Sequence, residues 1–199
     1  MARSLGVTRE QLIAVAAQLA DEGGLEQLTL AQVARQLGLR LPSVYNHVDG
    51  LPGLRRDLAI LGGRQLMEKI SRAAVGKASD QAVLAVAQVF RHYAVEHPGL
   101  YAAVSRAPAA DDPEAQQFGR EVVELVLAVL EPYALDETDS IHAVRGLRSL
   151  IHGFVLLEQA GGFGLPVDHE ASFLFLIRNY LAGLRAHSAE PAREHSPGL

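Results

Sequence analysis

Two short stretches of helical periodicity lie close to the start of the chain, between Leu28 and Val48. Apolar residues recur at helical spacing as far as Leu37, and the pattern breaks at Gly38. A second helix can begin at Pro42, because proline is tolerated in the first turn of a helix. The stretch therefore predicts two short helices close together, which suits a pair that crosses at a steep angle.

Such a pair needs particular residues at fixed offsets. A small residue must lie where the helices touch, and Ala34 meets this need. Gly38, four positions later, can make the turn without a Cβ clash. Val44 can pack back from the second helix, while Leu39 fills the corner. This spacing is typical of a helix-turn-helix motif.

The second helix then has an inner face with Val44 and Val48 and a polar outer face. Polar groups on such a face can donate to phosphates or contact base edges in the major groove of double-stranded DNA. The same pattern would also suit two amphipathic helices of an ordinary bundle. A preceding helix of suitable length and the N-terminal position favour DNA. The residues of the outer face and its entrance are Arg40, Leu41, Ser43, Tyr45, Asn46 and His47.

The rest of the chain reads as helix, and we identify no strand pattern and no internal repeat. Thr8 with Gln11 and Thr29 with Gln32 form capping boxes, which mark helix N-termini. We therefore expect an all-α protein of about nine helices, in which a three-helix DNA-binding domain precedes a C-terminal helical bundle. The expected parts are a DNA-binding domain (1–50), a connecting helix and joint (51–79), a ligand-binding and dimerisation domain (80–188) and a disordered tail (189–199).

Composition agrees with a globular chain that acts on nucleic acid. Apolar residues make up 49% of the 199 residues, enough for a substantial core. No apolar run reaches about 18 residues, so we expect no membrane span, and without cysteine or a secretory signal we expect a cytoplasmic location. The net charge is −5, but residues 1–72 carry +2 and residues 73–199 carry −7. This asymmetry suits a small DNA-facing module on an acidic body.

The segment "LTLAQVARQLGLRLPSVYNHVDGLPGLRRDL" resembles the DNA-binding domain of the tetracycline-repressor (TetR/AcrR) family, and the resemblance covers residues 8 to about 60. It implies an all-helical homodimer, a repressor that binds operator DNA and releases it when a small ligand enters the C-terminal domain. It also implies phosphate contacts from Thr29, Tyr45 and His47. Base or backbone contacts are implied for Arg40, Leu41, Ser43 and Asn46. Many relatives carry a phosphate-contacting lysine at the start of the fourth helix; this chain has none there, and either Arg55 or Arg56 substitutes or the contact is absent.

The segments "FRHYAVEHPGLYAAV" and "LRSLIHGFVLLEQAGGFG" resemble one branch of the ligand-binding domains of that family. Their helices are rich in aromatic residues and poor in inward charges, which favours an apolar or aromatic effector held by one or two hydrogen bonds. Each aromatic residue taken alone is more typical of an ordinary core than of a pocket. The expected pocket residues are Phe90, Tyr93, His97, Tyr101, Phe118, Val122, His152 and Phe154.

The last two long helices, about 137–160 and 168–187, offer more apolar residues than one bundle face needs, so we expect them to form a two-fold dimer. The expected interface residues are Ile151, Val155, Phe173, Ile177 and Leu184.

Enzymatic and metal sites receive little support. The pairs His92–Glu96 and Asp139–His142 have helical spacing but are common by chance, and no nucleophile elbow or phosphate-binding loop occurs. We therefore expect no catalytic residue, no cofactor and no metal. The alternative interpretation is a helical-bundle enzyme or small-molecule carrier without a DNA role.

Overall fold

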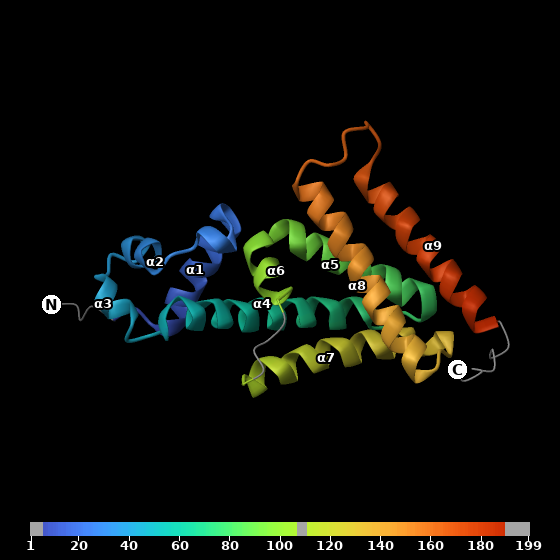
Figure 1. The fold of residues 1–199 in the computed structure, drawn as a ribbon, viewed down its shortest axis with the longest axis horizontal. Coiled ribbons are helices and arrows are strands. Elements are labelled where there is room, and N and C mark those ends of the chain that lie inside the picture. The colour runs from blue at the N-terminus through green and yellow to red at the C-terminus, as the bar shows by residue number, and fades with distance from the viewer. Residues whose placement is uncertain (1–5, 107–110, 190–199) are drawn as a thin grey trace, which may run out of the picture. The chain divides into compact units, whose positions relative to one another are not determined.

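The computed structural model describes residues 6–106 and 111–189, and these residues form helices without any strand. Nine α-helices and two short 3-10 helices follow one another along this part of the chain (Figure 1), which confirms the all-α prediction. The α-helices are α1 (Arg9–Gly23), α2 (Leu30–Gln36), α3 (Leu41–Val44), α4 (Gly50–Ala74), α5 (Ser79–Glu96), α6 (Pro98–Val104), α7 (Pro113–Leu130), α8 (Glu137–Gln159) and α9 (His169–Ala189), and the 3-10 helices are η1 (Leu25–Gln27) and η2 (Glu131–Tyr133). No helix in the described ranges is long and apolar enough to cross a membrane.

Both predicted capping boxes are present. The Gln11 amide donates to Thr8 Oγ1 over 3.3 Å, and the Thr8 amide donates to Gln11 Oε1 over 2.9 Å. Thr29 and Gln32 exchange the same two bonds over 3.2 and 2.7 Å. Each box satisfies two amides that a helix N-terminus leaves without partners, and such a cap contributes about 1 kcal/mol. The capping boxes therefore fix where α1 and α2 begin.

The chain groups into two compact units. The first unit consists of Met1–Glu68 and His92–Glu121, and the second consists of Lys69–Arg91 and Val122–Leu199. The parts expected from the sequence follow the order of the chain, with boundaries at 50 and 79. The observed units instead combine distant segments, because α4, α5 and α7 each supply residues to both. Apart from Ala189, the expected tail lies outside the described residues.

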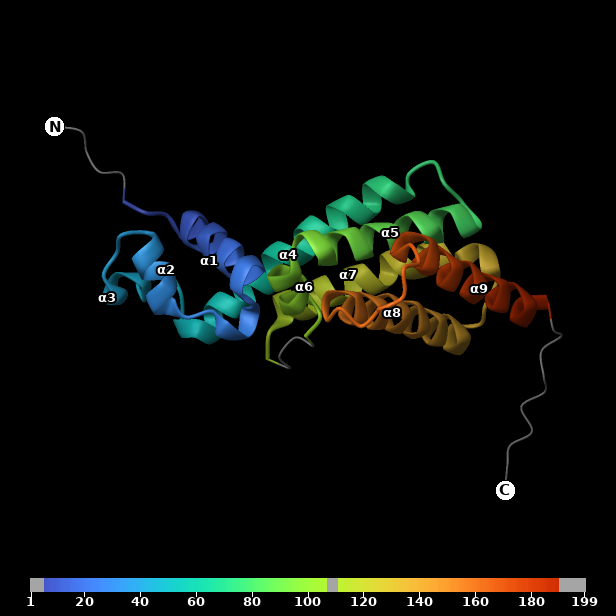
Figure 2. The ribbon, with the colours of Figure 1, turned by 90° about the horizontal axis from the view of Figure 1, so that it is seen from above.

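The first unit is built on α1. α2 packs against α1 and α3 packs against α2 (Figure 2), while α6 packs against the last turns of α1. Gly62 in the middle of α4 allows a close approach to α6, since a Cβ there would lie 3.0 Å from Val104 and 3.2 Å from Leu100. The fully buried side chains of this unit include Leu12, Val33, Val44, Leu54, Leu58 and Tyr93.

The second unit is dominated by the hairpin of α8 and α9 (Figure 1). Its core holds four of the five residues expected at a dimer interface: Ile151, Val155, Phe173 and Ile177 are almost completely buried within a single chain. This placement corrects the expectation, because side chains already covered by their own chain are not available to a second copy. Only Leu184 is half-buried. The apolar stripe that predicted an interface is the core stripe of the hairpin.

Arg91 is a buried charge in this unit. Its Nε and Nη2 donate to Glu158 over 3.0 and 2.6 Å, and Nη1 donates to Glu170. The guanidinium also lies 5.7 and 5.5 Å from the ring centroids of Phe154 and Phe173. The hydrogen bonds from Arg91 hold the pKa of Glu158 below its usual value. A buried ion pair with this many bonds ties the end of α8 and the start of α9 to α5.

Candidate nucleic-acid interface

The turn between α2 and α3 explains why a glycine is required at its centre. Gly38 has φ +65°, a left-handed conformation that side chains with a Cβ rarely adopt. Its amide donates to the Arg35 carbonyl over 3.2 Å, and the Leu39 amide donates to the Ala34 carbonyl over 2.8 Å. These two bonds form a Schellman motif, which ends α2 and turns the chain towards α3. The predicted role of Gly38 is confirmed.

Residues 40–48, which include α3 and the turns after it, form the recognition segment. Its inner face is buried as predicted. Val44 is fully buried, Val48 and Ala34 are nearly so, and Leu39 is half-buried. The regular helix is shorter than the sequence indicated, because α3 ends at Val44. The chain then continues in turns, and the Val44 carbonyl accepts from the amides of His47 and Val48 over 3.0 and 3.3 Å. These bonds keep the outward residues on one rigid segment.

The outer face is open to solvent. Thr29, at the N-cap of α2, is exposed, and so are most residues expected on the recognition segment. Tyr45 keeps 57% of its surface exposed, a large value for an aromatic residue. Side chains of this kind beside an anchored inner face are available to phosphates and base edges. Arg40, Leu41, Tyr45 and Asn46 are exposed, whereas Ser43 and His47 are half-buried.

Arg55, one of the two arginines considered as substitutes for the missing lysine, is directed towards η1. Its Nη2 lies 3.3 Å from the Leu25 carbonyl and 3.4 Å from Glu26 Oε2. Its Nε is buried without a hydrogen-bond partner. A guanidinium in this position supports the turn between α1 and α2.

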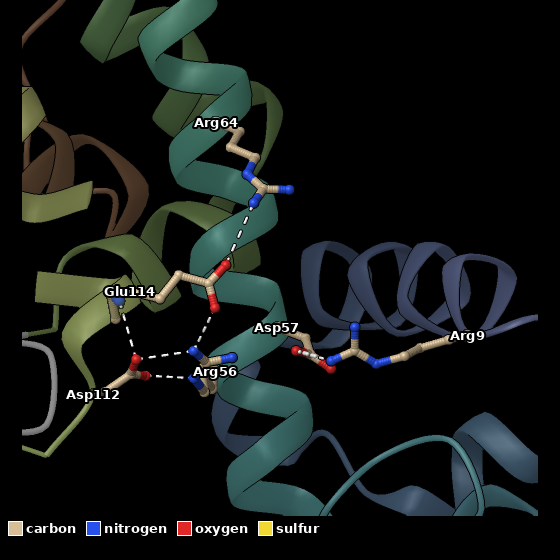
Figure 3. Close-up of polar contacts among 7 residues, drawn as sticks. Arg9, Arg56, Asp57, Arg64, Asp112 and Glu114 are labelled. Atoms are coloured by element: carbon tan, nitrogen blue, oxygen red, sulfur yellow. Dashed lines mark hydrogen bonds and ion pairs between the residues drawn. The ribbon is translucent and has the colours of Figure 1, made fainter. Parts of the chain in front are cut away.

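Arg56, the other candidate, is bound to the start of α7. It forms a bidentate pair with Asp112 and donates to Glu114 over 2.7 Å (Figure 3). Asp112 also accepts from the Ala115 amide over 3.1 Å, so it caps α7. The hydrogen bonds from Arg56 hold the pKa of Asp112 below its usual value. Both arginines are therefore engaged within the chain.

The next residue of α4 is a buried acid. Asp57 accepts from Nη2 of Arg9 over 2.6 Å (Figure 3), and its side chain keeps only 6% of its surface exposed, against 52% for Arg9. Burial raises the pKa of Asp57, and the nearby charge of Arg9 opposes this rise. The pair ties the start of α1 to α4 behind the recognition segment.

Known proteins share this arrangement. The family model described as the tetracyclin repressor-like C-terminal domain matches residues 83–180. An uncharacterized HTH-type transcriptional regulator of Mycobacterium tuberculosis is 38% identical over 185 residues, which cover 92% of this chain and 84% of that protein. YobS of Bacillus subtilis, also an uncharacterized HTH-type transcriptional regulator, is 34% identical and covers 92% and 96%. The chain belongs to the TetR family of transcriptional regulators.

Solved structures agree with the TetR fold. TetR of Acinetobacter baumannii AYE is similar with a TM-score of 0.68 at 20% identity, covering 93% of this chain and all of that one. A protein of unknown function from Rhodococcus sp. RHA1 has a TM-score of 0.76 at 21% identity, covering 92% and 98%. This TetR-family chain is thus a helix-turn-helix regulator of transcription, which confirms the function class predicted from its sequence.

The expected effector residues of this TetR chain fall into different units. Tyr93, His97 and Tyr101 belong to the first unit. The Tyr93 hydroxyl donates to Gln65 Oε1 over 3.1 Å, and His97 Nδ1 lies 3.1 Å from Asp21 Oδ2. The polar atoms of Tyr93 and His97 are thus bound within the chain. Phe90, Val122, His152 and Phe154 belong to the second unit, and the side chain of Phe118 lies outside what the structure describes.

A hollow that the sequence did not predict lies in the first unit, between α4 and α7. Its volume is about 230 Å³, and Ile60, Arg64, Glu114, Gln117 and Glu121 line it. Four of these five side chains are polar, so this hollow differs from the apolar pocket expected from the aromatic residues. In the described ranges no three His, Asp or Glu side chains gather closely enough to hold a metal ion.

Proposed function

We propose that this TetR-family regulator is a repressor that binds an operator as a homodimer, with the exposed face of Arg40–His47 in the major groove. The proposal rests on the difference in burial between the two faces of the recognition segment. Val44 and Val48 are buried on the inner face, while Tyr45 and Asn46 are exposed on the outer face. A reading face of this kind needs a fixed inner side, because base contacts depend on the position of each side chain.

A second copy would meet α8 and α9 at residues other than those expected from the sequence. The connection between α8 and α9, at the top of Figure 1, and the helix turns on either side of it carry several exposed apolar residues. Isolated apolar residues on a surface are ordinary, but a group of them on one hairpin end indicates a contact surface. The group comprises Leu156, Leu157, Leu165, Val167 and Phe175.

A small apolar or aromatic effector remains our proposal for the ligand that relieves repression. It would bind among the helices of the second unit that the C-terminal family model matches, where Phe90 and Phe154 supply aromatic surface. An effector can release DNA only if it binds the conformation that does not fit the operator more tightly than the conformation that does. A regulator of this kind acts on chromosomal DNA, which places it in the cytoplasm.

The proposal is tested by selecting duplexes from a random pool with the purified chain. We expect the enriched sequence to contain two inverted half-sites, with centres about 10 base pairs or a multiple of that apart. Affinity should fall steeply with salt as counterions are released. Enrichment of no sequence, or of a single asymmetric site bound by one copy, would contradict the proposal.

A further inference from the structure

α6 begins without a cap from its own neighbourhood. His97 occupies the N-cap position but its side chain makes no capping bond, and Pro98 has no amide to donate. The next amides, those of Gly99 and Leu100, both donate to Oδ1 of Asp21, over 2.8 and 3.0 Å. The carboxylate of Asp21 on α1 thus caps the N-terminus of α6, a role that usually belongs to a Ser or Asp directly before the helix.

The second oxygen of the same carboxylate is also engaged. Asp21 Oδ2 lies 3.1 Å from His97 Nδ1, and the His97 ring lies 5.0 Å from the ring of Tyr93. Tyr93 in turn donates to Gln65 on α4 over 3.1 Å. Contacts therefore run from Asp21 on α1 to His97, from His97 to Tyr93 on α5, and from Tyr93 to α4. All of these residues belong to the first unit.

The backbones of α1 and α6 meet directly beside Asp21. A Cβ on Gly99 would lie 2.2 Å from the carbonyl carbon of Ala20 and 2.4 Å from its oxygen, far closer than real atoms approach. Ala20 itself is fully buried. Gly99 is therefore required for close approach, and any side chain at this position would push α6 away from α1.

α1 also supports the DNA-reading helices, since α2 packs on it and α3 packs on α2. We infer that Asp21 is a positioning residue, which holds α1 and the recognition segment in a fixed position on α6. Two recognition segments in a dimer must match the spacing of two half-sites. The contact between Asp21 and α6 therefore affects the affinity for a pair of half-sites more than the affinity for either half-site alone. The inference rests on the proposed binding of a dimer to two half-sites.

The test compares Asp21→Ala, Asp21→Asn and Glu22→Ala in the full chain. Asparagine keeps one side-chain oxygen that can accept from the amides of Gly99 and Leu100, whereas alanine removes both side-chain oxygens. Glu22 is the matched control, because it lies on the same turn, is exposed and accepts from Gln18 of its own helix over 2.8 Å. The probes are the duplex that the wild-type chain enriches from a random pool and the same duplex with one half-site scrambled.

We expect Asp21→Ala to weaken binding to the intact duplex about tenfold, the size of a lost cap, while binding to the scrambled duplex stays within about twofold. Asp21→Asn should retain most of the affinity, and Glu22→Ala all of it. The amides of Gly99 and Leu100 should exchange hydrogen faster in Asp21→Ala alone. Gly99→Ala, which separates the same helices by steric clash, should reproduce the selective loss.

Two results would overturn the inference. Equal losses on both duplexes would show that Asp21 acts only through the stability of the reading helices. Unchanged affinity despite faster exchange at Gly99 and Leu100 would show that the cap exists but does not position the recognition segment. A wild-type chain that enriches no duplex would instead refute the proposed function, and this inference with it.

Discussion

Nη2 of Arg9 donates to Oδ1 of Asp57 over 2.6 Å, and the two partners differ in burial: Asp57 is almost fully covered and Arg9 is half exposed. Burial of Asp57 disfavours its ionised form, and the half-exposed Arg9 only partly offsets this. The pKa of Asp57 is accordingly raised. At neutral pH the ionised carboxylate therefore lowers the stability of the folded chain relative to a neutral isostere.

The first prediction follows from the sign of that shift. Since the folded pKa lies above the unfolded one, the contribution of Asp57 to the free energy of unfolding grows as pH falls from neutral towards about 3.9. Asp57→Asn should be as stable as the wild type at pH 7, or more stable, and should lose this advantage as pH falls. Arg9→Gln should cost about 1 kcal/mol at pH 7. Urea unfolding at several pH values measures both, and a strongly destabilised Asp57→Asn at pH 7 would contradict the account.

The second prediction concerns salt. Arg40 is exposed on the reading face, whereas Arg55 and Arg56 are bound to η1 and to the start of α7. Arg40→Ala should reduce the slope of log affinity against log salt by about 1, because one phosphate contact is lost. Arg55→Ala and Arg56→Ala should leave that slope unchanged. A reduced slope in either of these two variants would mean that its guanidinium leaves its observed partners to contact DNA.

The third prediction concerns the dimer. Phe175 keeps 70% of its surface exposed on α9, so Phe175→Glu should not disturb the fold of one chain. We expect it to shift the chain from dimer to monomer in sedimentation, because it places a charge in an apolar contact. Val75→Glu is the control, since Val75 is equally exposed but lies in the joint between α4 and α5. A Phe175→Glu dimer as stable as the wild type would exclude this end of the hairpin.

The fourth prediction concerns the effector. Val122 is half-buried on α7, and a larger side chain there would occupy space among the C-terminal helices. Val122→Trp should weaken both the binding of anilinonaphthalene sulfonate, a dye that fluoresces in apolar sites, to the folded dimer and the release of DNA by uncharged apolar compounds. Val75→Trp should leave both unchanged. Full ligand response in Val122→Trp would place the pocket elsewhere, and a response only to charged compounds would favour the polar hollow at Arg64 and Glu114.

Sequence patterns predicted the local structure well where one short stretch contained all the determinants. The capping boxes at Thr8 and Thr29, the turn at Gly38 and the buried Val44 each depend on residues only a few positions apart. The same reasoning identified the exposed face of the recognition segment, because its direction follows from the inward residues.

Contacts between distant residues were not predictable in this way. Helical spacing shows that Ile151 and Ile177 each lie on the apolar stripe of their own helix. It does not show whether such a stripe packs in a core or forms an interface. The bonds from Asp21 to the start of α6 join residues 78 and 79 positions apart, and no local pattern indicates them. One weak signal was available, since Pro98 and Gly99 begin a helix that has no capping residue of its own.

The most direct test of the central claim is operator affinity in variants of the recognition segment, measured by fluorescence anisotropy on the enriched duplex. Tyr45→Ala and Asn46→Ala should each weaken specific binding by about 1–3 kcal/mol with an unchanged melting temperature, because both side chains are exposed. Val44→Asp should instead unfold the reading helices, since it buries an unpaired charge. Wild-type operator affinity in both Tyr45→Ala and Asn46→Ala would contradict the assignment of this face to DNA.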